Sequence, residues 1–73
     1  MDKRAAAAGL MVRPKRPGCS VWTDPWWGGR IAAALSGRPL LIVLEVSGTH
    51  DYIRILAPGG LVGWVNPLLV DDL

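Results

Sequence analysis

The sequence predicts a small all-β domain, a barrel or sandwich of four or five short strands. Short runs rich in Val, Ile, Leu, Tyr and Trp recur along residues 19–73 at roughly even spacing. Gly and Pro separate these runs and mark the turns between them. At 73 residues, the chain is long enough for one domain with one small core. These three observations together favour an all-β architecture.

The composition predicts an apolar surface. The chain is 51% hydrophobic and only 19% charged, which is more apolar side chain than a domain of this size buries in its own core. We therefore expect an exposed apolar face that contacts a protein partner or a second copy of the chain. The single cysteine excludes an internal disulfide.

The charge is distributed unevenly. Residues 1–18 hold five basic residues and one acidic residue, a net charge of +4, whereas residues 19–73 have a net charge of −2. We interpret residues 1–18 as a basic N-terminal arm, extended because of its prolines, and residues 19–73 as the domain. In the arm, Arg13, Lys15 and Arg16 are the candidates for contact with phosphate, with an acidic protein surface or with solvent alone.

The first half of the domain gives one clear strand, one ambiguous segment and one long apolar strand. Alternation over 19–23 places Cys19 on the core side as a small apolar residue. The Ala-rich segment 30–38 has the local propensity of a helical turn, although it is short and flanked by Gly. Residues 40–46 are apolar at nearly every position, which predicts a strand covered on both faces.

The second half predicts a hairpin. Residues 52–56 alternate as a strand, 57–60 contain Pro and two Gly and form the turn, and 61–65 pair back. Trp64 in this returning strand is expected to form part of the wall of the barrel. Pro67 ends the strand, and a last apolar run follows it.

The order of these residues resembles the bacterial SH3 (SH3b) family over about residues 19–70. The stretch Cys-Ser-Val-Trp-Thr-Asp-Pro at 19–25 is similar to the opening of that family. Further matching positions are Leu35, Gly37, the run at 40–46, Tyr52, Ile55, Gly60 and Gly63-Trp64-Val65. The resemblance implies a five-stranded SH3-like barrel over residues 19–73. It also implies binding of peptides, cell-wall glycans or other proteins.

Four aromatic residues are the candidate partner-binding residues: Trp22, Trp26, Trp27 and Tyr52. On an SH3-like barrel the first loop folds over the strand that carries Tyr52, so we expect these side chains to form one exposed plate. Aromatic side chains with a polar atom are common anchors of interfaces. The alternative is that Trp22 covers the end of the barrel and that only Trp26 and Trp27 are exposed.

No catalytic or cofactor-binding pattern is present in the sequence. His50 and Asp51 are neighbours in a turn, an arrangement that rarely makes a base and its orienting partner. One Cys and one His cannot complete a zinc site. No apolar run approaches the roughly 20 residues of a membrane span, and no convincing signal peptide is present. We expect a non-enzymatic protein without metal or cofactor, cytoplasmic or associated with a virion.

Three functional interpretations follow. The first is a small structural subunit of a larger assembly, such as a phage particle or another multi-subunit complex, which docks onto protein partners or its own copies through apolar and Trp-rich surfaces and the basic arm. The second is a free adaptor that recognises a peptide or a cell-wall glycan through the aromatic plate. The third is nucleic-acid binding through the basic arm.

Overall fold

The structure is a computed structural model that describes residues 9–24, 29–47 and 52–73. Its elements are, in order, β1 (Met11–Pro14), β2 (Ser20–Trp22), β3 (Ile31–Ala34), β4 (Leu41–Val46), β5 (Ile53–Leu56), η1 (Pro58–Gly60), β6 (Val62–Val65), η2 (Pro67–Leu69) and β7 (Val70–Asp72). The two η elements are single 3-10 turns, and the rest of the described residues are strand or loop. The all-β class predicted from the sequence is confirmed.

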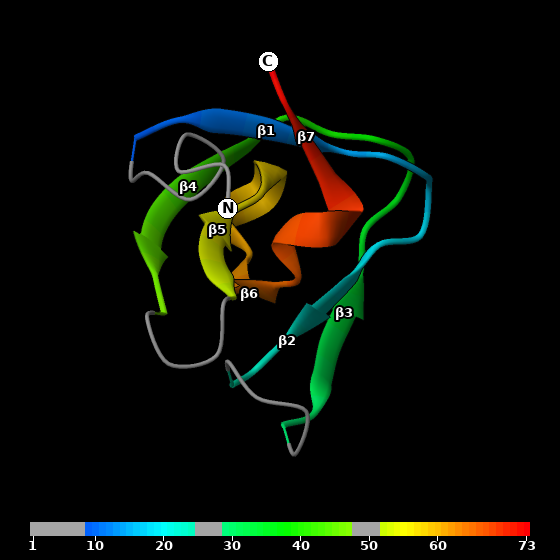
Figure 1. Cartoon of the computed structure of the whole chain (residues 1–73). Helices are drawn as coiled ribbons and strands as arrows, with labels where there is room; N and C mark the ends of the chain where they lie inside the picture. Colours follow the sequence, from blue (N-terminus) through cyan, green and yellow to red (C-terminus); the bar gives the residue numbers. More distant parts are fainter. Residues whose placement is uncertain (1–8, 25–28, 48–51) are drawn as a thin grey trace.

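The seven strands form one antiparallel sheet in the order β3-β2-β6-β5-β4-β1-β7. Figure 1 shows that this sheet is strongly curled, with the β2–β3 hairpin at one side. Among the described residues, the edge strands β3 and β7 do not pair with each other, so the sheet is open. The expected five-stranded closed barrel is therefore corrected to a curled sheet of seven strands.

Strand β1 lies inside the sheet, in the segment that the sequence analysis assigned to the basic arm. It pairs with β4 through Met11 and Val12, and with β7 through Val12, Arg13 and Pro14. The side chain of Val12 is fully buried, because alternation turns it toward the core. The domain therefore includes residues 11–14, and the expected boundary at residue 18 differs from the structure. Residues 1–8 lie outside the described residues.

The Ala-rich segment forms strand β3 rather than a helical turn. It pairs with β2, with Ala33 opposite Val21 and Ala34 opposite Ser20. The next residue, Leu35, is buried in the core. Pairing with β2 and burial of Leu35 outweigh the weak local preference of alanine for helix, because so short a helix is marginal on its own.

The core lies on the concave side of the sheet. Its buried side chains are Val12, Cys19, Val21, Leu35, Leu41, Val43, Ile53, Ile55, Ala57, Val65 and Val70. Cys19 is among them, as expected. Strand β4 is buried on one face only: Leu41 and Val43 point inward, while Ile42, Leu44 and Val46 are each 38–39% exposed. The prediction that β4 is covered on both faces is wrong, because no described element packs over its outer side.

The hairpin of β5 and β6 matches the sequence prediction. Ile53 pairs with Val65 and Leu56 with Val62, and the turn between them includes η1. Gly59 and Gly60 both have positive φ angles, 88° and 86°, which side chains other than glycine adopt only with strain. These two glycines explain why the turn could be located from the sequence.

Candidate functional site

The predicted aromatic residues that the structure describes, Trp22 and Tyr52, lie on the outer face of the sheet. Trp22 in β2 is directly opposite Trp64 in β6, and Trp64 is opposite Arg54 in β5. Tyr52 precedes Arg54 by two residues, so alternation places it on the same face. Both Trp22 and Tyr52 are half-buried. Trp26 and Trp27 lie outside the described residues.

The register therefore adds Trp64 to the aromatic group. It also places the ion pair of Arg54 and Glu45 next to this group. Arg54 donates a hydrogen bond from Nη1 to Oε2 of Glu45 at 2.7 Å, and Glu45 is its cross-strand partner in β4. Trp22, Trp64, Arg54 and Glu45 thus form one row across four strands. Because the ion pair balances its own charges, this row offers aromatic surface beside a group of no net charge.

A second row on the same face is entirely apolar, and we call it the outer apolar row. Met11, Ile42, Leu56 and Val62 are successive cross-strand partners on β1, β4, β5 and β6. The N–H of Leu73, the residue after β7, donates a long hydrogen bond of 3.4 Å to the carbonyl of Met11. Leu73 therefore continues the row on the other side of β1. Four of these side chains remain exposed: Met11 by 41%, Ile42 and Val62 by 39%, and Leu73 by 67%.

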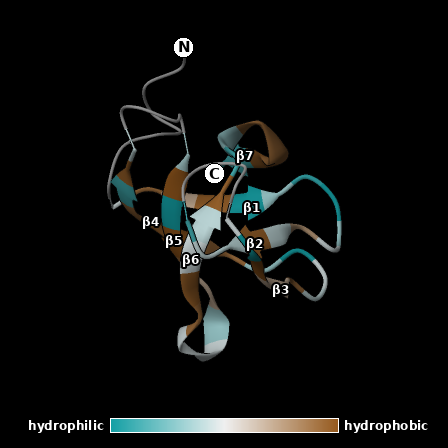
Figure 2. Cartoon of the chain, turned by 90° about the horizontal axis from the view of Figure 1, so that it is seen from below, coloured by the Kyte–Doolittle hydropathy of each residue, from teal (hydrophilic) through white to brown (hydrophobic). Residues whose placement is uncertain are grey.

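Figure 2 shows apolar residues, in brown, along β4 and β5 and at the turn that precedes β7. Leu44, 38% exposed, adds to the outer face by the alternation along β4, and the register shift between Val43 and Glu45 places Glu45 on the same face. Exposed apolar side chains that gather in one strip, rather than being scattered singly, are a feature of many surfaces that contact another protein. The sequence indicated an apolar excess, but not the strands on which it gathers.

The three predicted basic residues do not form one patch. Arg13 lies within β1 opposite Asp71, half-buried, with its Nε atom buried and without a hydrogen-bond partner. Nζ of Lys15 is 3.9 Å from Oδ1 of Asp71, an exposed pair worth little in water. Arg16 is exposed and has no ion pair with any described residue. The acidic strand β7 thus offsets part of the positive charge that the sequence analysis assigned to an isolated arm.

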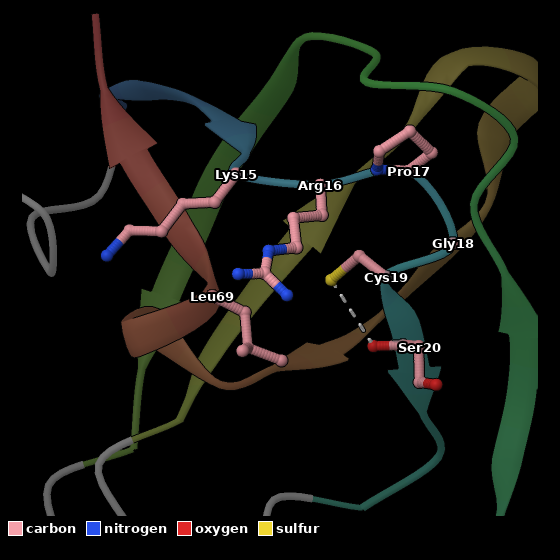
Figure 3. Close-up of a pocket in the computed structure, with 7 residues that line it drawn as sticks. All are labelled: Lys15, Arg16, Pro17, Gly18, Cys19, Ser20 and Leu69. Carbon is pink, nitrogen blue, oxygen red and sulfur yellow. Dashed lines mark hydrogen bonds between the residues drawn. The ribbon is translucent and has the colours of Figure 1, made fainter.

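Lys15 and Arg16 border a shallow pocket of about 380 Å³, shown in Figure 3. The other lining residues are Pro17, Gly18, Cys19, Ser20 and Leu69. In this view the amine of Lys15 points away from the other lining side chains. The pocket therefore combines the apolar side chain of Leu69 with the guanidinium of Arg16, which extends between Leu69 and Cys19 in this view.

Cys19 contributes a buried thiol to this pocket. It is only 8% exposed, and its Sγ lies 3.8 Å from the carbonyl oxygen of Ser20, a weak hydrogen bond drawn as a dashed line in Figure 3. Burial raises the pKa of this thiol above its ordinary value of 9.0, because the charged thiolate loses hydration there. Cys19 is therefore a protonated core residue at neutral pH, not an activated nucleophile.

The described ranges, residues 9–24, 29–47 and 52–73, contain one cysteine and few acidic side chains. No group of three or more His, Cys, Asp and Glu side chains in these ranges is placed to hold a metal ion. His50 and Asp51 lie outside these ranges. Within the same ranges, no helix has the length and hydrophobicity needed to cross a bilayer.

Comparison of the chain with protein-family models, with curated proteins and with solved structures finds no significant match. The similarity to the bacterial SH3 family accordingly depends on the residues quoted above alone. The candidate surface is defined by the register and exposure of this chain's own residues.

Proposed function

We propose that this chain is a non-enzymatic protein-docking module, a small structural subunit that binds a larger assembly through the outer face of its sheet. The observation that supports this most directly is the outer apolar row. Its members are held in register by the backbone pairing of the strands, so they form a rigid, preorganised strip. Covering exposed apolar surface of this kind stabilises a complex by roughly 25 cal/mol per Å² of apolar area removed from water, before the cost of association.

The aromatic row supports the same interpretation. Trp22 and Trp64 lie beside the apolar strip, with Tyr52 on the same face, and tryptophan and tyrosine are the side chains most often found at the centre of protein interfaces. The alternative proposal is a free adaptor that holds a peptide or a glycan on these three aromatic residues. Its supporting observation is their placement on one face rather than at opposite ends of the sheet.

We also propose that the fold is an open relative of the SH3-like barrel. Strands β4, β5 and β6 follow one another as a meander, and β7 returns across the sheet to pair with β1. This order, with the strong curl of the sheet, supports the finer assignment. It leaves the β2–β3 hairpin as a long excursion between β1 and β4.

The test of docking uses the chain in its source cells. Ile42→Glu/Val62→Glu places two charges in the outer apolar row at positions already 39% exposed, so the fold is expected to persist. Leu68→Glu is the matched control, because Leu68 is 75% exposed on η2 and lies outside the row. The wild-type chain and the control should fractionate with a particle much larger than 7.8 kDa, and the double variant should move to the free fraction.

A second pair of variants separates the two proposals. Trp22→Ala/Tyr52→Ala removes aromatic surface and leaves the outer apolar row intact. If this change releases the chain while Ile42→Glu/Val62→Glu does not, the aromatic adaptor replaces the docking module. Retention of both variants in the particle would exclude the outer face as the binding surface.

A further inference from the structure

The two edges of the sheet differ in how they are protected against pairing. Edge strand β7 carries Asp71 and Asp72, and charged side chains on an edge discourage the addition of another strand. Edge strand β3, which reads Ile-Ala-Ala-Ala, has neither charge nor proline, and within the described residues it pairs with β2 alone. Figure 1 shows it as the outer strand of the β2–β3 hairpin. The unprotected edge is therefore β3.

The hydrogen bonds of the hairpin identify the backbone groups that face outward. The N–H of Leu35 donates to the carbonyl of Cys19, and its carbonyl accepts from Gly18, so both groups face β2. The carbonyl of Arg30 likewise accepts from the N–H of Thr23. Ala34 and Ile31 each adjoin a residue whose backbone faces β2, so their own backbone groups point to the free edge, whereas Ala32 is the extra residue of the register shift and falls outside this alternation.

These two outward residues are three positions apart rather than two. The register of β2 against β3 shifts between Val21 and Trp22, and this irregularity adds one residue to β3. A regular strand presents its donors and acceptors at every second residue, so its hydrogen-bonding groups would not align with both Ala34 and Ile31 of β3. A second β3 in antiparallel orientation has the same spacing and matches it.

We propose that β3 is a self-association edge, at which a second copy of the chain adds its own β3 antiparallel across a two-fold axis. Ile31 then lies opposite Ala34 of the second copy, and Ala34 opposite its Ile31. In this register Arg30 faces Leu35 of the other copy, so no like charges meet. Ile31, which is 56% exposed in the monomer, gains a small neighbour that leaves room for it.

This inference goes beyond the proposed docking function, because it concerns a different part of the molecule. The interface is isologous: each copy supplies the same strand, and the sheet of seven strands continues into that of its neighbour. A short strand pair of this kind makes a weak dimer, formed at high local concentration such as that inside an assembly.

The experiment measures mass in solution by sedimentation equilibrium of the full chain, from roughly 10 µM to 1 mM, the range in which small interfaces dissociate. The wild-type chain should shift from 7.8 kDa toward twice that mass. Ile31→Lys/Ala34→Lys sets two pairs of lysines opposite each other and should stay monomeric throughout. Ile31→Glu/Ala34→Lys also places two charged side chains on β3, like the double lysine variant. It sets Glu of one copy opposite Lys of the other, and should dimerise.

Both double variants change only exposed positions of β3, so each should keep the unfolding transition of the wild-type chain, measured in urea. A wild-type chain that stays monomeric to the highest concentration overturns the inference. So does a lysine–lysine variant that dimerises, or a Glu–Lys variant that does not. Ile42→Glu/Val62→Glu should dimerise like the wild-type chain, which keeps failure of the docking proposal distinguishable from failure of this one.

Discussion

Gly63 lies where strand β6 packs closely against β2. A methyl group at this position would lie 2.9 Å from the carbonyl oxygen of Trp22 and would overlap a methyl group of Val21. The glycine therefore lets β6 lie against β2 within a packed core. The sequence shows a Gly before Trp64, but only the long-range contact with β2 shows that the requirement is space rather than a turn.

Gly63→Ala should destabilise the fold by about 1–3 kcal/mol, because the added methyl forces the backbones of β6 and β2 apart. The measurement is the free energy of unfolding in urea. Val62→Ala, at the adjacent outward-facing position, is the control and should change it by less than about 1 kcal/mol. Equal stability of the Gly63→Ala and wild-type chains would mean that the two strands do not approach as described.

The buried thiol of Cys19 predicts a pH dependence. Because burial raises its pKa above 9.0, the unfolded chain releases this proton at a lower pH than the native chain does. Between the two pKa values the native state holds more protons, so this contribution to stability is complete below pH 9.0 and is lost as pH rises through the native pKa. Unfolding free energies from about pH 8 to 11 should fall more steeply for the wild-type chain than for Cys19→Ala. Parallel curves would contradict the burial of the thiol.

At the scale of elements, the turn η2 depends on one side chain. Oδ1 of Asn66 accepts a hydrogen bond from the N–H of Leu68 at 2.9 Å, which caps the turn that leads into β7. Pro67 at the first position of the turn has no N–H to satisfy. The pair Asn-Pro therefore ends β6 and starts η2 within two residues.

Asn66→Ala should lower the free energy of unfolding by about 1 kcal/mol, since it removes the cap acceptor. Asn66→Asp keeps an oxygen at the same position and should stay within a few tenths of a kcal/mol of the wild-type chain. Both values come from urea unfolding followed by tryptophan fluorescence. If Asn66→Ala and Asn66→Asp lower the free energy of unfolding by the same amount, the cap hydrogen bond does not stabilise η2.

Elements with strong local signals could be predicted, and those held by distant partners could not. The β5–β6 hairpin has alternating side chains and two glycines with positive φ, all within 14 residues, so its strands and turn were recognisable. Strand β1 ends in Pro14 and lies within a basic segment, and β3 is rich in Ala. Neither has a local preference for strand, and both form through pairing with β4, β7 or β2.

At the scale of the whole molecule, the sequence predicted that an apolar surface exists but not where it lies. The outer apolar row combines side chains from β1, β4, β5 and β6, which are far apart in the chain. Their alignment depends on register, and a shift of one residue would turn each strand's outward set inward. Composition contains no information about register, so the position of the outer apolar row could be found only from the strand pairing in the structure.

The position of β1 predicts that the domain needs residues 11–14. Deleting residues 1–18 removes the strand that joins β4 to β7 and takes the fully buried Val12 from the core. The shortened chain should lose its cooperative unfolding transition in urea, because β7 then has no neighbour in the sheet. Deleting residues 1–8 retains every strand described here and is the control.

A cooperative transition in the chain of residues 19–73 would show instead that β1 is dispensable. The domain would then begin where the sequence analysis placed its boundary. The same comparison can be followed by the dispersion of amide signals in solution NMR, which reports whether a fixed tertiary structure persists.

The pairing of β1 with β7 also determines when the chain can fold during its synthesis. Met11–Pro14 is among the first described segments to leave the ribosome, whereas its partner Val70–Asp72 is among the last. Until Val70–Asp72 has been synthesised, the edge of β1 that pairs with β7 has no partner, and the apolar residues of the hairpins have no complete sheet to pack in. Non-local pairing of this kind slows folding and lengthens the time for which apolar segments are accessible to other chains. A nascent chain of this protein therefore exposes apolar segments until Val70–Asp72 is available to pair with β1.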